Sequence, residues 1–213
     1  MNNYYNCNLI FQIFNFYRDV VLISAEAIET LGRTVFLPEM WYLISAWSRT
    51  FFIGLAGLTG LIWLVKQNLT YWRLPAALGL GLGIVVPINY LLRRIFASPR
   101  PFEVGNFEPL EHFQPLLQRD VTYGFPSNHA AATAVFAICF ILVGYKKTGA
   151  LVTLLTLLVG ASRVIVGLHF IGDIIGGWVV GITCGYLGYR LEKPVTALLA
   201  HTGRKTGLID IEI

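Results

Sequence analysis

The stretch 149–189, GALVTLLTLLVGASRVIVGLHFIGDIIGGWVVGITCGYLGY, decides the fold. It holds two apolar runs, about 149–168 and 170–189, and most of its polar side chains gather where the runs meet. Each run is close to the roughly 20 residues that a helix needs to cross a bilayer core, and neither alternates like a half-buried strand. We therefore expect two membrane helices joined by a tight turn. On the second, glycines every four residues permit close helix contact; they are Gly177, Gly181 and Gly185.

Three further apolar stretches precede this pair, at about 40–65, 74–92 and 129–145. The first contains Arg49, and a charge inside a span is expected to face the bundle interior or an interface. The composition agrees, since 55% of the 213 residues are hydrophobic and only 13% are charged, against about 25% charged residues in soluble domains. The sequence predicts an all-α membrane bundle of five to six transmembrane helices.

The chain is expected to divide into three parts. Residues 1–39 form an interfacial or partly membrane-embedded helical segment, 40–190 the transmembrane core, and 191–213 a cytoplasmic tail. Within the first part, the apolar segment 8–30 is interrupted by charges, which suits a helix lying in the membrane interface, although a sixth crossing stays open. The interrupting charges are Arg18, Asp19, Glu26 and Glu29.

The basic residues indicate an orientation rather than a nucleic-acid partner. The net charge is +4, but the cations are scattered between apolar segments and form no stripe. By parity of the spans, most loop cations share one face, which the positive-inside rule makes cytoplasmic. They are Lys66, Arg73, Lys146, Lys147, Arg190, Lys193, Arg204 and Lys205. The opposite face then carries the segment 93–128 and the turn near 163–172.

Two polar clusters lie at helix ends on that opposite face. The first is RRIFASPRP at 93–101, whose arginines could simply be snorkelling anchors. The second is GFPSNH at 124–129, which leads into a predicted helix. Ser127 or Asn128 would make an ordinary N-cap, but the open N–H groups of a helix N-terminus can also bind an anion. In that case His129 would stand at the edge of an anion site.

The third cluster is Ser162-Arg163, followed after five residues by His169 and after three more by Asp173. If a helix begins near His169, these last two residues share a face. A carboxylate that binds one imidazole nitrogen fixes the tautomer and makes the other nitrogen a better nucleophile. The plainer alternative is a surface histidine beside an aspartate that the helix dipole favours.

With Arg94 set aside as an anchor, the clusters supply seven candidate groups to one membrane face, namely Arg93, Arg100, Arg163, Ser127, His129, His169 and Asp173. Guanidinium groups bind phosphate oxygens in a planar, bidentate way. Two histidines allow a nucleophile on one side of phosphorus and an acid for the leaving group on the other. So many convergent polar groups favour phosphoryl chemistry over anchoring.

The three clusters resemble the signature of the type-2 phosphatidic acid phosphatases, a superfamily that includes the vanadium haloperoxidases. That signature reads Lys-x6-Arg-Pro, Pro-Ser-Gly-His and Ser-Arg-x5-His-x3-Asp, and the resemblance covers about residues 40–190. The third motif matches without a departure. Arg93 stands where the family usually has lysine, and Asn128 replaces the usual glycine, which bears on specificity more than on competence. The resemblance implies the haloperoxidase-like helical core for this chain.

The resemblance also implies a mechanism. His169 looks like the nucleophile that forms a phosphohistidine, Asp173 like its orienting partner, and His129 like the acid for the leaving oxygen and then the base for water. The implied phosphate-binding residues are Arg93, Arg100, Ser127, Asn128 and Arg163. Because preformed cations stabilise the charge that develops on the equatorial oxygens, we expect neither a metal nor another cofactor.

The implied substrate is a membrane lipid phosphate or diphosphate, reached from the bilayer. Undecaprenyl diphosphate is the preferred expectation, and phosphatidic acid and phosphatidylglycerol phosphate come next. We expect an integral protein of a bacterial inner membrane with its active site on the periplasmic or extracellular face. A lipid phosphotransferase with the same phosphohistidine, or a lipid-phosphate binding or transport protein without turnover, stays an alternative. The oligomeric state stays open.

Overall fold

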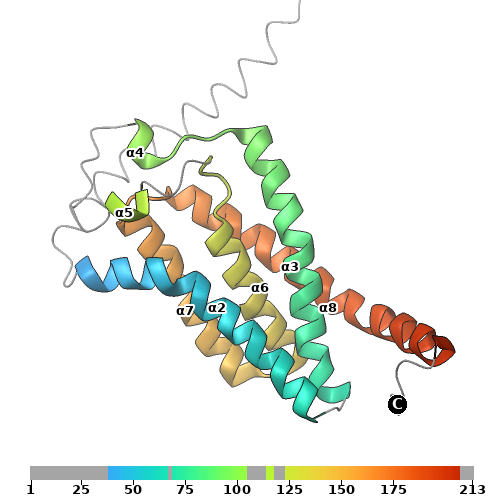
Figure 1. Cartoon of the computed structure of the whole chain (residues 1–213). Helices are drawn as coiled ribbons and strands as arrows, with labels where there is room; N and C mark the ends of the chain where they lie inside the picture. The colour runs from blue at the N-terminus through green and yellow to red at the C-terminus, as the bar shows by residue number, and fades with distance from the viewer. Residues whose placement is uncertain (1–37, 67–68, 105–113, 118–122, 207–213) are drawn as a thin grey trace, which may run out of the picture.

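A bundle of helices forms the part of the chain that the structure describes, namely residues 38–66, 69–104, 114–117 and 123–206 of this computed structural model (Figure 1). The helices are α2 (Pro38–Lys66), α3 (Leu69–Phe96), α4 (Pro101–Val104), α5 (Gln114–Leu117), α6 (Asn128–Val143), α7 (Lys146–Ile165) and α8 (Ile171–Thr206). The described residues contain no strand, so the all-α prediction is confirmed for them. The expected segment 8–30 lies outside the described residues.

Five of the helices coincide with the five predicted spans. Four of them, α2, α3, α7 and α8, are long and apolar enough to cross a membrane. The fifth, α6, is equally apolar but has 16 residues. At 1.5 Å per residue it is about 24 Å long, less than the roughly 30 Å bilayer core. In Figure 1 its first turn accordingly lies lower in the bundle than the end of α3.

Helix α6 is packed against α3, α7 and α8, and the glycines of α8 permit that packing. A Cβ atom added at Gly181 would overlap the carbonyl oxygen of Ala131, and one at Gly185 would lie 3.2 Å from the carbonyl oxygen of Val135. The backbones of α6 and α8 therefore approach as closely as the glycine spacing predicts. This contact brings the start of α6 beside the start of α8.

Helix α8 continues well past the predicted end of the last span at residue 189, through Pro194 to Thr206. The contacts of the extra turns explain this difference. The buried Glu192 accepts a hydrogen bond from Nε of Arg73 at 2.8 Å, and Oγ1 of Thr196 accepts one from Nε1 of Trp72 at 2.7 Å. These contacts with α3 stabilise the part of α8 that follows residue 189, where the apolar run ends.

Substituting Gly181 with alanine should destabilise the bundle, because the new methyl group must displace the backbone of α6. We expect the free energy of unfolding to fall by about 1–3 kcal/mol. The matched control is Gly79→Ala on α3, where a Cβ atom meets nothing within 4 Å. Thermal unfolding in detergent, followed by size-exclusion chromatography, measures both variants. Equal midpoints for the two would contradict the close α6–α8 contact.

Candidate active site

All the residues of the three polar clusters lie at one end of the bundle. The elements that deliver them are the last turn of α3 (Arg93), the linker before α4 (Arg100), the loop 123–127 and start of α6 (Ser127, Asn128, His129), the last turn of α7 (Arg163), the turn 166–170 (His169) and the first turn of α8 (Asp173). Helices that alternate in direction bring these termini to the same side, as the parity of the spans predicts.

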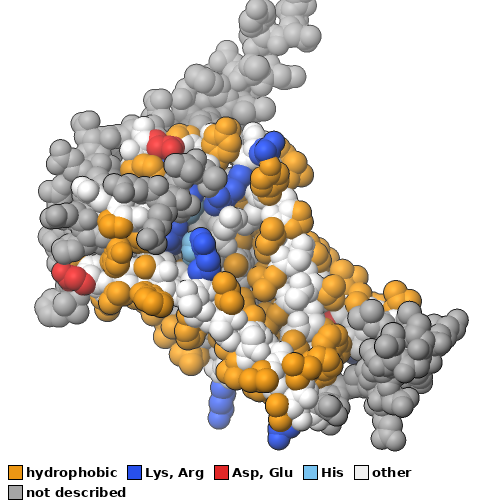
Figure 2. All heavy atoms as spheres, viewed as in Figure 1, with side chains coloured by type: hydrophobic (Ala, Val, Ile, Leu, Met, Phe, Trp, Pro, Cys, Tyr) orange, Lys and Arg blue, Asp and Glu red, His pale blue; other side chains and the backbone are white. Residues whose placement is uncertain are grey.

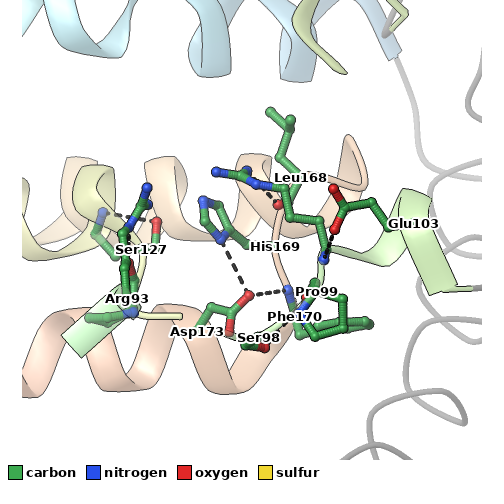
Figure 3. A network of polar contacts seen from close by, with 12 residues as sticks. Arg93, Ser98, Pro99, Glu103, Ser127, Leu168, His169, Phe170 and Asp173 are labelled. Atoms are coloured by element: carbon green, nitrogen blue, oxygen red, sulfur yellow. Dashed lines mark hydrogen bonds and ion pairs between the residues drawn. The ribbon is translucent and has the colours of Figure 1, made fainter. Parts of the chain in front are cut away.

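His169 and Asp173 form a buried pair at this end of the bundle, and Figure 3 shows the two side chains pointing toward each other. Nδ1 of His169 lies 3.3 Å from Oδ2 of Asp173, which also accepts a hydrogen bond from the backbone N–H of Phe170 at 3.0 Å. The side chains are 1% and 0% exposed. His169 precedes α8 instead of beginning it, yet the predicted pairing is present. With Nδ1 engaged as a donor, Nε2 is the nitrogen left to act as a nucleophile.

The surroundings of His169 keep its imidazole neutral. Burial is the largest cause that lowers the pKa of His169 well below its ordinary value of 6.5, and the positive charges of Arg163, Arg100 and Arg93 lower it further. A neutral ring has the lone pair that a nucleophile needs. Because burial disfavours the imidazolium, the nucleophilic form persists at pH values below those at which a surface histidine becomes protonated.

Two arginines are built into the protein interior around this pair. Nη1 of the fully buried Arg100 donates to the carbonyl oxygen of Leu168 at 3.0 Å, so the residue before His169 helps to position the guanidinium. Nη1 of Arg163 donates to Oγ of Ser45 on α2 at 2.9 Å. Such anchored guanidinium groups are preorganised to bind an anion, since little side-chain freedom remains to be lost on binding.

Arg93 and Ser127 lie on one side of His169 in Figure 3, away from Leu168 and Glu103. Nε of Arg93 donates to the carbonyl oxygen of Pro126 at 3.2 Å. Ser127 is the N-cap of α6 and accepts the N–H of Ala130 at 3.5 Å. The cap uses the hydroxyl as an acceptor, so its proton can still be donated to an anion. The capping role and the anion-binding role are therefore compatible.

His129 and Asn128 face a cavity of about 930 Å³ between α2, α3 and α6. Figure 2 shows histidine surface at the bottom of a hollow, beside arginine surface and bordered by hydrophobic side chains. His129 makes no hydrogen bond with another described residue, so both ring nitrogens are available to a ligand. Much of the remaining cavity wall is apolar; its lining includes Phe52, Ile53, Ala56, Leu82, Val85, Val86, Ala132 and Phe136.

The structure adds residues that the motifs did not reveal. Asn89, only 2% exposed on α3, donates from Nδ2 to Oδ1 of Asn128 at 2.9 Å. A buried amide within an apolar span was the available signal, because such a residue needs a polar partner. Arg49 lines the same cavity, in agreement with its expected inward position. Arg94 lies 4.7 Å from the centre of the Tyr90 ring, which suits the anchoring role considered for it.

This arrangement can bind a phosphoryl group and attack it. Three guanidinium groups and a hydroxyl surround a neutral, carboxylate-oriented imidazole, and a second imidazole stands at the mouth of the site. The described residues contain no group of three His, Cys, Asp or Glu side chains suited to a metal ion. Metal independence stays a prediction that chelation can test.

Comparisons with known proteins agree with this chemistry. A family model for the PAP2 superfamily matches residues 71–196. The undecaprenyl-diphosphatase of Sulfolobus acidocaldarius is 26% identical over 196 residues, which cover 87% of this chain and 89% of the relative. The undecaprenyl-diphosphatase BcrC of Bacillus subtilis is 26% identical, with 86% and 81% covered. The phosphatidylglycerophosphatase B of the same organism is 29% identical over about half of each chain.

Solved structures show the same fold. The crystal structure of the PAP2-type phosphatidylglycerolphosphate phosphatase from Bacillus subtilis aligns with a TM-score of 0.60 and 21% identity, over 87% of this chain and 95% of that one. LpxE from Aquifex aeolicus aligns with a TM-score of 0.55 and 18% identity, over 78% and 93%. With its apolar helices, its motifs and these relatives, the chain belongs to the PAP2 superfamily and is one of its membrane-embedded lipid phosphatases.

Proposed function

We propose that this protein removes the terminal phosphate of a lipid diphosphate, with undecaprenyl diphosphate as the preferred substrate, through a phosphohistidine on His169. The His169–Asp173 pair among buried arginines carries the proposal, because it combines an oriented neutral nucleophile with an anion site. Two relatives that align over most of their length are named undecaprenyl-diphosphatases, which supports the diphosphate. Phosphatidylglycerol phosphate and phosphatidic acid are the competing substrates.

The first chemical step transfers the phosphoryl group to the enzyme. Nε2 of His169 attacks the terminal phosphorus, the bond from phosphorus to the bridging oxygen breaks, and His129 gives its proton to that oxygen. The lipid monophosphate is the leaving group. Charge on the equatorial oxygens is stabilised by the guanidinium groups and by Ser127, and the Asp173 carboxylate stabilises the positive ring of the phosphohistidine. The residues that hold the phosphoryl group are Arg93, Arg100, Ser127, the backbone amide of Asn128, and Arg163.

The second step releases inorganic phosphate. His129, now neutral, takes a proton from water while the water oxygen attacks phosphorus and the phosphorus–nitrogen bond breaks. His169 returns to its neutral form with Nδ1 still oriented by Asp173. His129 carries a proton again, so the enzyme is ready for another substrate. The cycle consumes one water molecule for each phosphate released and uses no cofactor.

The reaction is proposed to occur at the outer face of a bacterial inner membrane. The described cations Lys66, Arg73, Lys146 and Lys147 lie at or near the helix ends opposite the site, and Arg190 lies in the second half of α8; the positive-inside rule makes that side cytoplasmic. Residues 191–213 would accordingly form the cytoplasmic tail, whose first turns are the extension of α8. The lipid tail would stay in the bilayer while its phosphates enter from the side of the apolar cavity wall.

Substituting either histidine should strongly lower the rate of phosphate release, for different reasons. His169→Ala removes the nucleophile and should lower the rate at least about 10³-fold, whereas His129→Ala removes the acid and base and should lower it about 10²–10⁴-fold. Purified protein in detergent is incubated with undecaprenyl diphosphate in EDTA, and inorganic phosphate is measured. Wild-type release in EDTA without an acceptor alcohol supports metal-free hydrolysis over phosphotransfer.

The phosphoenzyme distinguishes the two histidines. A diphosphate has a good leaving group, so His129→Ala should still be phosphorylated but should lose the water step and accumulate acid-labile, base-stable label from terminally labelled substrate. His169→Ala should take up none. Label on both variants, or on neither although wild type turns over, would contradict the phosphohistidine on His169.

Replacing Asp173 with asparagine keeps the shape of the site but removes the charge that stabilises the phosphohistidine ring. We expect kcat to fall about 10²–10⁴-fold. Glu103→Gln is the matched control, because this carboxylate at the same end accepts the backbone N–H of Arg100 at 2.9 Å, a bond that a glutamine oxygen can also accept. Phosphate release and the thermal midpoint are measured together. Similar kcat values for both variants would rule out the orienting role of Asp173.

A further inference from the structure

Arg49 is a charge that the catalytic motifs leave unexplained. It is the only charged residue of α2 between Glu39 in the first turn and Lys66 in the last. A charge within a membrane span is costly and persists where it faces a polar cavity or a functional site. The side chain of Arg49 lines the cavity that also contains Arg93 and His129. Its position therefore points to a negatively charged ligand in that cavity.

The charge of Arg49 acts on the leaving-group side of the site. Arg49 and His129 line the same cavity between α2, α3 and α6. His169, Arg100 and Arg163 are not among the described residues that line this cavity. Arg49 thus lies toward the histidine that meets the leaving oxygen rather than toward the nucleophile. A negatively charged group of the substrate beside Arg49 would therefore be the group that is bonded to the leaving oxygen.

Asn128 adds a neutral donor at the same place. Its side chain is exposed to the cavity, and its Oδ1 accepts a hydrogen bond from Nδ2 of the buried Asn89 at 2.9 Å. This bond occupies the carbonyl oxygen of Asn128 and leaves its NH₂ group as the part available to a ligand. Burying an asparagine in the apolar span of α3 costs free energy unless its amide is hydrogen-bonded. The bond that Asn89 makes also fixes the position of the Asn128 amide.

We propose that Arg49 and the side-chain amide of Asn128 form a second phosphate subsite, which binds the lipid-linked phosphate of a diphosphate substrate. The inference rests on the proposed function and deepens it. When the terminal phosphate lies at His169 and the bridging oxygen at His129, the remaining phosphate lies beyond His129 on the cavity side. The apolar wall that begins there suits the lipid chain that this phosphate carries.

The subsite would favour diphosphates in both binding and chemistry. As the bond to the bridging oxygen breaks, negative charge develops on the departing lipid monophosphate until His129 has transferred its proton, and Arg49 lies beside that phosphate. A guanidinium stabilises that charge in the transition state more than in the ground state, which raises kcat. A lipid monophosphate places only an ester oxygen and carbon there, so it gains little from Arg49.

The test compares farnesyl diphosphate with farnesyl monophosphate, which share one chain and differ by one phosphate. Arg49→Gln should lower kcat/KM for the diphosphate about 10–100-fold, the range of one charged hydrogen-bonding partner, and for the monophosphate about 2-fold or less. Arg49→Lys should recover part of the loss, because charge returns without the planar fork. Asn128→Gly should shift the ratio in the same direction by a smaller factor.

Arg94→Gln is the matched control. It also removes an arginine that lines the cavity, but this one belongs to α3 and lies over the Tyr90 ring. It should change both substrates about equally and little. A size-exclusion profile like that of wild type shows that each variant is folded. Equal losses for both substrates in Arg49→Gln, or no loss for either, would overturn the second subsite while the lipid phosphatase function stands. Wild-type protein that releases phosphate from neither undecaprenyl diphosphate nor the farnesyl compounds would instead refute the proposed function.

Discussion

The carboxylate of Asp173 is the group on which the geometry of the site depends. Its Oδ2 accepts the backbone N–H of Phe170 and pairs with Nδ1 of His169, while the backbone oxygen of the same residue accepts the N–H of Ser127 at 3.0 Å. One residue thus joins the first turn of α8, the turn that carries His169 and the loop before α6. A buried carboxylate requires such partners, because an unsatisfied charge in the interior is strongly unfavourable.

Close packing of α6 against α8 connects the contacts of Asp173 to the rest of the bundle. The glycine face of α8 brings α6 near enough for Ser127 to meet the backbone of Asp173, and a Cβ atom at Gly177 would lie 2.7 Å from the carbonyl oxygen of Ser127. Because the glycines of α8 have no side chains, the first turns of α6 and α8 lie in direct backbone contact. Small residues are the usual means of such contact in membranes, where apolar burial does not by itself drive helices together.

The two sides of the site are built differently, and this difference suits the proposed reaction. Around His169 the cations are buried and anchored to the backbone or to neighbouring helices, as for Arg100 with Leu168 and Arg163 with Ser45. Around His129 the site opens into the cavity between α2, α3 and α6. The rigid side suits the phosphoryl group that is transferred, and the open side suits the leaving group with its lipid chain.

The linear pattern alone determined the helical class, the five apolar helices of the described residues and the end of the bundle where the polar residues gather. Apolar length and motif spacing are local quantities, so these features follow without a structure. Tertiary packing decided the rest. The continuation of α8 depends on Arg73 and Trp72 from a distant helix, and the places of Asn89 and Arg49 depend on which face of α3 and α2 meets α6. An apolar span shows no face until its neighbours are placed, because lipid and protein interior are equally apolar.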